Sequence, residues 1–201
     1  MARITDITMQ RNGKRANIFV DGRFKCGLEN ITVLSSGLKI GQETDDETLE
    51  ALQLSSETEN AFNKALSYVS LRRRTEKEVR LKLREKGYLN SVIDAATGKL
   101  KDYGYIDDTK YAEDYVAMYK SRFGEIRLRA ELRRLGIAEK TVNDVLSELD
   151  EDEIYQSALS AAEKYLQSHD FDRPKLSRHL AAKGYSYGVV GRAIRAVEKE
   201  K

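Results

Sequence analysis

Three segments of this chain repeat one pattern of apolar residues around a glycine. They read VRLKLREKGYLNSVIDAATGKL, LRAELRRLGIAEKTVNDVLSEL and LSRHLAAKGYSYGVVGRAIRAV, and their glycines are Gly87, Gly136 and Gly184. Leucine stands four positions before each glycine, and an aliphatic residue stands eight positions before it. A period of 20–50 residues is typical of repeat architectures. We therefore predict three tandem three-helix units of roughly 48 residues each.

The spacing inside each unit predicts how its helices pack. Apolar residues three and four positions apart give each helix one buried stripe. The glycine follows the second helix, where a residue in the left-handed conformation can cap the helix C-terminus. The next residue, which is Tyr88, Ile137 or Tyr185, is expected to pack back on that helix. Tandem units would share a core and form an elongated, curved helical body.

A small β module is predicted before the repeats. Residues 4–9 and 16–20 are β-branched and apolar, and the Asn12-Gly13 pair between them favours a tight hairpin turn. The strands form a meander over residues 3–27, followed by a short helix over residues 29–34 that ends at Gly37. The fold class is therefore mainly α, with an N-terminal β module. The predicted segments are the β module (1–43), an acidic linker helix with a Thr44–Glu47 capping box (44–57), and the repeats (58–104, 105–150 and 151–201).

Composition limits where and how such a chain can act. The net charge is only +2, yet residues 43–59 hold seven acids and no base, and residues 71–136 hold 17 bases and 11 acids. The lone Cys26 has no partner for a disulfide, which fits a reducing compartment. No apolar run approaches the ~20 residues that span a membrane. We expect a soluble, cytoplasmic protein without a membrane partner, and nothing in the sequence demands more than a monomer.

Catalytic and metal-binding motifs are absent from the sequence. His169 and His179 are the only histidines, and neither has a cysteine or acid at a metal-ligand spacing. No phosphate-binding glycine loop or nucleophile elbow occurs. Asp107 and Asp108 are expected to cap a helix rather than to hold a metal ion. We therefore expect no enzyme activity, no cofactor and no metal.

Several motifs resemble those of a known family. The run ALSYVSLRRRTEKEVRLKLREKGY, followed by GYIDDTKYAEDYV and GEIRLRAELRRLGI, resembles the RecX family, which regulates the RecA recombinase. The resemblance implies a modulator that binds the groove of the filament formed by RecA on single-stranded DNA. It also implies inhibition of ATP hydrolysis, strand exchange and co-protease activity, with effects on DNA repair and the SOS response. Members of the family also bind DNA alone, so single-stranded DNA is an expected partner. Binding to double-stranded DNA stays an open alternative.

Basic residues recur at the same place in each unit. A filament presents phosphates and acidic protein surface, and both attract such residues. The alternative is a solvated helix surface that carries mixed charges and ion pairs between neighbouring turns. The candidate DNA- or filament-binding residues are Arg72, Arg73, Arg74, Lys77, Arg80, Arg84, Lys86, Lys120, Arg122, Arg127, Arg129, Arg133, Arg134, Arg178 and Lys183.

Tyrosines are frequent in the middle unit and have two interpretations. They could stack on nucleic-acid bases or pack in the core. We expect Tyr111 and Tyr115 in the core and Tyr119 on an exposed face.

Two other classes of function stay open on the sequence. Three-helix units resemble helix-turn-helix modules, and their arginine-rich second helices could enter a groove of duplex DNA as part of a sequence-specific regulator. The basic faces could instead bind acidic proteins only, as a helical scaffold. Binding to single-stranded DNA that weakens steeply with salt, without sequence preference, separates these classes from the first.

Overall fold

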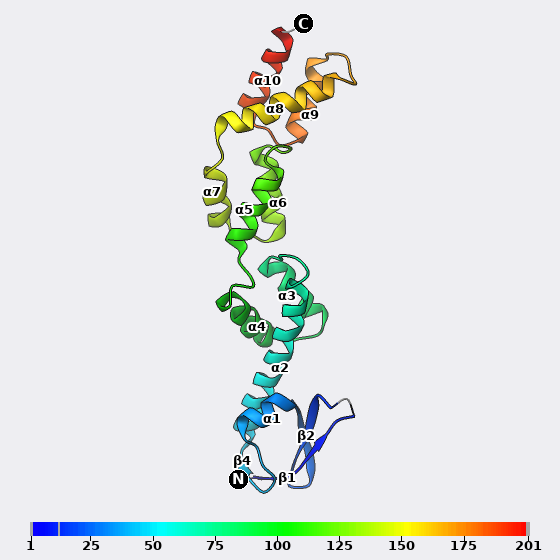
Figure 1. Cartoon of the computed structure of the whole chain (residues 1–201), viewed down its shortest axis with the longest axis vertical. Helices are drawn as coiled ribbons and strands as arrows, with labels where there is room; N and C mark the ends of the chain where they lie inside the picture. The colour runs from blue at the N-terminus through cyan, green and yellow to red at the C-terminus, as the bar shows by residue number, and fades with distance from the viewer. Residues whose placement is uncertain (1, 12, 200–201) are drawn as a thin grey trace. The chain divides into compact units, whose positions relative to one another are not determined.

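The computed structural model describes residues 2–11 and 13–199. Within them the chain forms four β-strands and ten α-helices (Figure 1), which confirms the mainly α fold with an N-terminal strand module. The chain divides into two compact units. Unit 1 comprises residues 1–73 and 79–106, and unit 2 comprises residues 74–78 and 107–201.

The strands form one antiparallel sheet in unit 1. β1 (Ala2–Met9), β2 (Arg15–Val20) and β3 (Arg23–Glu29) make the predicted meander. A short strand that the sequence did not reveal, β4 (Glu43–Thr44), pairs with the free edge of β1, so the strand order is β3-β2-β1-β4. Helix α1 (Asn30–Ser36) follows β3 and ends at Gly37, as predicted. Asn12 of the predicted hairpin turn lies outside the described residues.

Helix α2 (Asp46–Val69) joins the sheet to the first repeat. It continues without a break through residue 57, the predicted end of the linker helix. Leu49 packs with Ile4 and Ile18 of the sheet, while the later part of α2 belongs to the next core. The capping box predicted at Thr44 is wrong, because Thr44 lies in β4 and the cap is Asp45. The Asp45 carboxylate accepts a 2.7 Å hydrogen bond from the Thr48 amide, and bonding to Thr48 lowers the pKa of that carboxyl.

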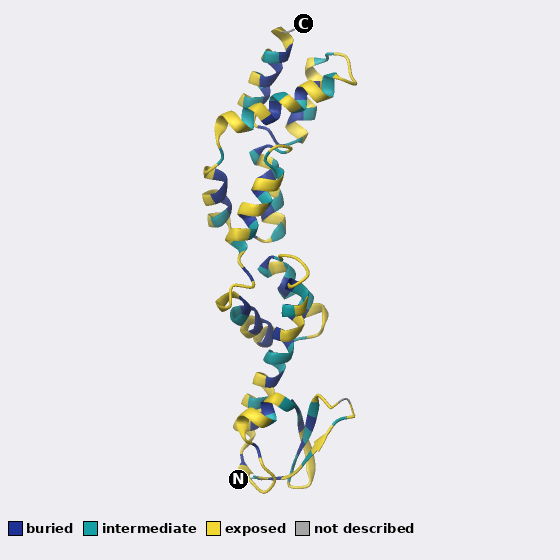
Figure 2. Ribbon diagram, in the orientation of Figure 1, coloured by how far each residue is buried: buried dark blue, intermediate teal, exposed yellow. Residues whose placement is uncertain are grey.

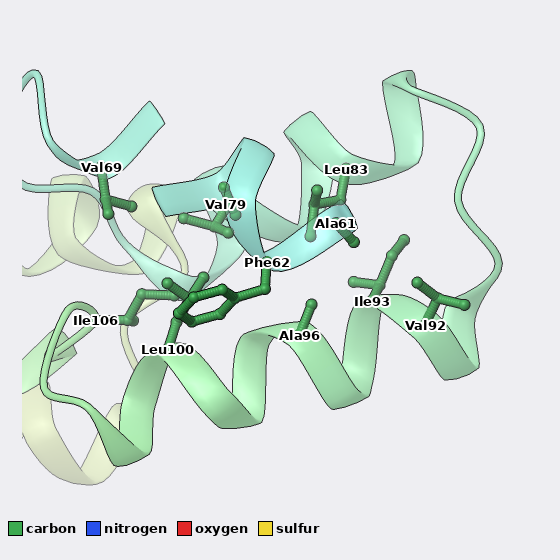
Figure 3. Packing of buried hydrophobic residues seen from close by; sticks show 11 residues of the cluster. Ala61, Phe62, Val69, Val79, Leu83, Val92, Ile93, Ala96, Leu100 and Ile106 are labelled. Carbon is green, nitrogen blue, oxygen red and sulfur yellow. The ribbon is translucent and has the colours of Figure 1, made fainter. Parts of the chain in front are cut away.

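The first helical core forms where α3 (Glu76–Glu85) and α4 (Asn90–Asp102) pack against the C-terminal part of α2. Figure 3 shows Phe62 of α2 beside Leu100 of α4, with Val79 and Leu83 of α3 in the same cluster. Val79, Leu83 and Leu100 occupy repeat positions and are at most 1% exposed. Burying each such side chain contributes roughly 1.5–3 kcal/mol.

Unit 2 contains two further helix trios. The first comprises α5 (Asp108–Tyr119), α6 (Glu125–Leu135) and α7 (Glu139–Ser147). The second comprises α8 (Glu151–Leu166), α9 (Arg173–Ala182) and α10 (Tyr187–Lys199). Each trio has its own core, and buried stretches run along its helices (Figure 2). The predicted leucines Leu132 and Leu180 are fully buried. The three predicted trios are confirmed.

The repeat glycines end the second helices in the predicted manner. Gly87, Gly136 and Gly184 have φ values of 84°, 90° and 87°, a left-handed conformation that favours glycine. The amide of the next residue bonds the carbonyl of the leucine four positions before the glycine, over 3.3, 3.1 and 3.3 Å respectively. This pair of features is a Schellman cap, which satisfies carbonyls left unpaired at a helix end.

Candidate functional site

In unit 2, the residues before α3 contact the glycine turn after α6. Thr75 is fully buried, and its hydroxyl donates a 2.9 Å hydrogen bond to the Leu135 carbonyl. Lys77 donates through Nζ to the Arg134 carbonyl at 2.9 Å, and its stem packs on Gly136. Thr75 and Glu78 also form a reciprocal capping box at the start of α3. Lys77, a candidate binding residue, therefore joins two repeats.

The same junction recurs between the next two repeats. The Gly124 and Ile126 amides donate 3.0 Å hydrogen bonds to the Lys183 and Gly184 carbonyls. Arg127 packs its Cβ against Gly184 and places its guanidinium 3.9 Å from the centre of the Phe123 ring. The candidate residue Arg127 is thus part of the packing between the repeats.

Six other candidate cations form ion pairs inside the molecule. Arg74, Arg129 and Arg134 pair with acids three or four residues away, as in the alternative that the sequence left open. Arg80, Lys120 and Arg133 pair with acids of another helix. The pairs are Arg74–Glu78 at 3.3 Å, Arg80–Asp94, Lys120–Glu153 at 2.5 Å, Arg129–Glu125 at 3.0 Å, Arg133–Glu139 at 2.6 Å and Arg134–Glu131 at 2.9 Å. The hydrogen bond from Arg133 lowers the pKa of Glu139. Except for the partly buried Arg74–Glu78 pair, these pairs are exposed at one or both side chains. Exposed pairs contribute little stability, about 0–1 kcal/mol each, but each one neutralises a charge.

Five of the remaining candidates keep their charge available. Among the described residues, no carboxylate lies within ion-pair distance of Arg84, Lys86, Arg122, Arg178 or Lys183. Arg178 donates to the Pro174 carbonyl of its own helix at 3.3 Å.

Arg72 and Arg73 are exposed between α2 and α3, and Arg72 donates to the Arg73 carbonyl at 3.4 Å. The contact role of all fifteen residues stays a prediction.

Two pockets collect some of the available cations. In unit 1, Lys86 lines a pocket of about 580 Å³ together with Lys64, Lys82 and the acids Glu29 and Glu59, so its charge is mixed. In unit 2, Arg122 and Lys183 line a pocket of about 440 Å³. The fold thus brings together two candidates that are distant in the sequence.

The tyrosines of the middle repeat mostly pack inside it. Tyr111 and Tyr115 contact the core, as predicted. The expected exposure of Tyr119 is wrong, because its ring stacks on Phe123 at 5.6 Å and also contacts Tyr115 at 4.6 Å.

The candidate metal residues have structural roles. Asp107 accepts a 2.8 Å hydrogen bond from the Lys110 amide and caps α5, as predicted. Asp108 accepts one of 2.9 Å from the Glu76 amide. In the described part of the chain, no three His, Cys, Asp or Glu side chains gather in a way that could hold a metal ion. No described helix has both the length and the apolar character for crossing a membrane.

Family models match most of the chain. They are described as the regulatory protein RecX N-terminal domain, over residues 2–45, and as the first and second three-helix domains of RecX, over residues 61–105 and 107–146.

Whole proteins and solved structures match as well. A regulatory protein RecX from Clostridium perfringens is 34% identical, covering 97% of this chain and 96% of the relative. The one from Bacillus licheniformis is 30% identical, covering 100% and 79%.

A crystal structure of regulatory protein RecX covers 94% of this chain and 97% of its own, with a TM-score of 0.73 and 26% identity. That of RecX from Lactobacillus salivarius covers 72% of this chain and 98% of its own, with a TM-score of 0.66 and 28% identity. The chain therefore belongs to the RecX family, a family of regulatory proteins and not of enzymes.

Proposed function

We propose that this protein binds in the groove of the filament that RecA forms on single-stranded DNA and inhibits its ATP hydrolysis, strand exchange and co-protease activity. Membership of the RecX family carries the proposal, because the resemblance extends over the N-terminal module and the helix trios alike. Through the filament, the protein would modulate DNA repair and the SOS response.

The distribution of available charge supports this proposal. Arg84 and Lys86 in unit 1, and Arg122 and Lys183 in unit 2, have no carboxylate partner among the residues described. Phosphates and acidic protein surface both attract unneutralised cations, and release of counterions from the DNA makes such binding favourable at low salt.

The junctions between the repeats speak against a helix-turn-helix regulator. In such regulators the N-terminal residues of the recognition helix contact base edges in the major groove. The N-terminal residues of α3 and α6 instead contact glycine turns of this chain, through Thr75 and Gly124. A scaffold that binds only proteins is distinguished by an absence of DNA binding.

The test is a titration of the protein into RecA, single-stranded DNA and ATP while ATP hydrolysis is measured. We expect hydrolysis to be suppressed at amounts well below one per recombinase protomer. A control with excess bare DNA separates inhibition of the filament from sequestration of the strand, since sequestration would then be relieved. Unchanged hydrolysis across the titration would overturn the proposal.

A further inference from the structure

The pocket of about 440 Å³ in unit 2 gathers positive charge from three separate elements. Arg122 comes from the segment after α5, Lys164 from α8 and Lys183 from the end of α9. No carboxylate lines this pocket, and none of the three cations forms an ion pair with a described acid. By contrast, most candidate cations on α6 are neutralised.

The negative C-terminal ends of the helices near the pocket do not neutralise all of its positive charge. The lining includes residues at or just after the C-termini of α5, α8 and α9. Each helix C-terminus carries roughly half a negative charge, which favours cations nearby. Three such ends offset about half of the three positive charges. The pocket therefore keeps a positive field that only an external anion can neutralise.

Hydroxyl groups and stacked rings complete the lining. Ser121 and Ser160 contribute hydroxyls that can donate hydrogen bonds, whereas the Ser168 hydroxyl already contacts the Tyr165 carbonyl and His169 Nδ1. The Tyr165 ring stacks on His169, at 4.2 Å between centroids and 6° between planes. Tyr165 also contacts His179 at 4.7 Å. Two imidazoles thus lie in the pocket lining beside the cations.

The repeat junction holds the walls of this pocket in place. The Lys183 carbonyl accepts the Gly124 amide at 3.0 Å, which ties the end of α9 to the segment that carries Arg122. Little backbone ordering is then needed on binding, so the entropic cost of binding comes mainly from the cationic side chains.

We propose that this pocket binds a phosphate group, with Arg122, Lys164 and Lys183 supplying the charge and the serine hydroxyls supplying further donors. Cationic side chains and hydroxyls together are the groups that recognise phosphate oxygens. The phosphate belongs either to a DNA strand or to a free nucleotide. If the phosphate comes from a DNA strand, the inference rests on the proposed function. Binding of phosphate in the pocket itself requires no recombinase.

His179 predicts how binding depends on pH. Burial lowers the pKa of His179, and the positive charges of Lys183 and His169 lower it further. A bound phosphate offsets those charges and raises the pKa of His179. By linkage, a phosphodiester of a DNA strand, whose own charge stays constant in this range, then binds more tightly as the pH falls through the range in which His179 titrates.

The test compares two variants of the full chain that carry equal net charge. The site variant is Arg122→Gln/Lys164→Gln/Lys183→Gln. The control, Arg23→Gln/Lys39→Gln/Lys140→Gln, removes three exposed cations elsewhere. With a labelled twelve-nucleotide oligothymidylate, we expect the site variant to bind about tenfold more weakly than the control. The slope of its log affinity against log salt should be shallower by about 0.7 for each phosphate that it no longer binds. Equal affinities for both variants would overturn the inference.

A second measurement uses the unmodified protein and does not depend on the folding of any variant. The ring resonances of His169 and His179 are followed by NMR during titration with inorganic phosphate, ATP and the oligothymidylate. Shifts with the oligothymidylate alone identify a strand site, and shifts with all three identify a general phosphate site. An absence of shifts with every probe refutes the pocket. Shifts without inhibition of RecA would leave the pocket standing and remove the proposed function.

Discussion

Glycine at position 124 brings the backbone of one repeat into contact with the backbone of the next. An added Cβ at Gly124 would overlap the carbonyl carbon and oxygen of Gly184. Both are backbone atoms, so they cannot move aside as the end of a flexible side chain can. The hydrogen bonds from Gly124 and Ile126 would then lengthen or break. The absence of a side chain at this position is therefore a condition for the junction.

We predict that Gly124→Ala destabilises unit 2 by about 1–3 kcal/mol, as overpacking does in other tightly packed sites. The matched control is Gly98→Ala in the middle of α4, where an added Cβ meets nothing within 4 Å. That control should stabilise its helix by about 0.5–1 kcal/mol, since alanine is the better helix former. Urea unfolding of both variants measures the two effects, and a neutral Gly124→Ala would contradict the account of the junction.

At the scale of the helix, the three second helices begin in three different ways. Thr75 and Gly124 occupy corresponding positions, and each contacts the glycine turn of the following repeat. Asp172, at the corresponding position of the third repeat, instead accepts the Lys175 amide of its own helix at 3.0 Å. Pro174 follows in the first turn and lacks an amide hydrogen. Asp172 thus caps its own helix, as Thr75 also does at the start of α3.

We predict that Asp172→Ala lowers stability at neutral pH and that the loss disappears in acid. The Lys175 amide lowers the pKa of Asp172 in the folded protein. The unfolded chain, in which the carboxyl has its ordinary pKa of about 3.9, therefore binds the proton more readily. The stabilising contribution is complete above about pH 4 and is lost as the pH falls through the folded pKa.

Thermal unfolding of the Asp172→Ala variant between pH 2 and pH 7 measures this dependence. Asp170→Ala, which removes an exposed carboxylate two positions earlier, should leave the profile unchanged. A loss of stability that stayed constant down to pH 2 would show that the Asp172 charge is not involved.

At the scale of the whole molecule, ion pairing divides the cations into two classes. Those on α6 are largely neutralised by Glu125, Glu131 and Glu139. Arg84 and Lys86, at the end of α3, have no acidic partner in the described ranges. Net charge is thus a poor guide to where an anionic partner binds.

We predict that Arg84→Gln/Lys86→Gln weakens binding to the oligothymidylate and to the RecA filament. The slope of log affinity against log salt should fall by about 1.4 for two phosphate contacts. Arg23→Gln/Lys39→Gln removes the same charge from the sheet and the loop after α1, and it should change the slope far less. Equal slopes for the two variants would mean that only net charge matters, and circular dichroism verifies the fold of each.

Much of the fold was predictable because its determinants are local. The left-handed glycine caps and the Thr75–Glu78 capping box depend on residues within one or two helical turns. One error arose where a distant segment intervened. The pairing of β1 with β4 placed Thr44 in a strand and moved the helix cap to Asp45. The other error was local, because the Tyr119 ring stacks on Phe123, only four residues later, and is partly buried there.

The sequence by itself determined the three helix trios, because apolar periodicity and glycine caps act over a few residues. Only the tertiary structure decided which cations are neutralised and which converge. Lys120 pairs with Glu153 of a later helix, and Lys164, which the sequence did not single out, lines one pocket with Arg122 and Lys183. The physical reason is that charges interact through space over a few ångströms, and only the packing of the helices sets those distances.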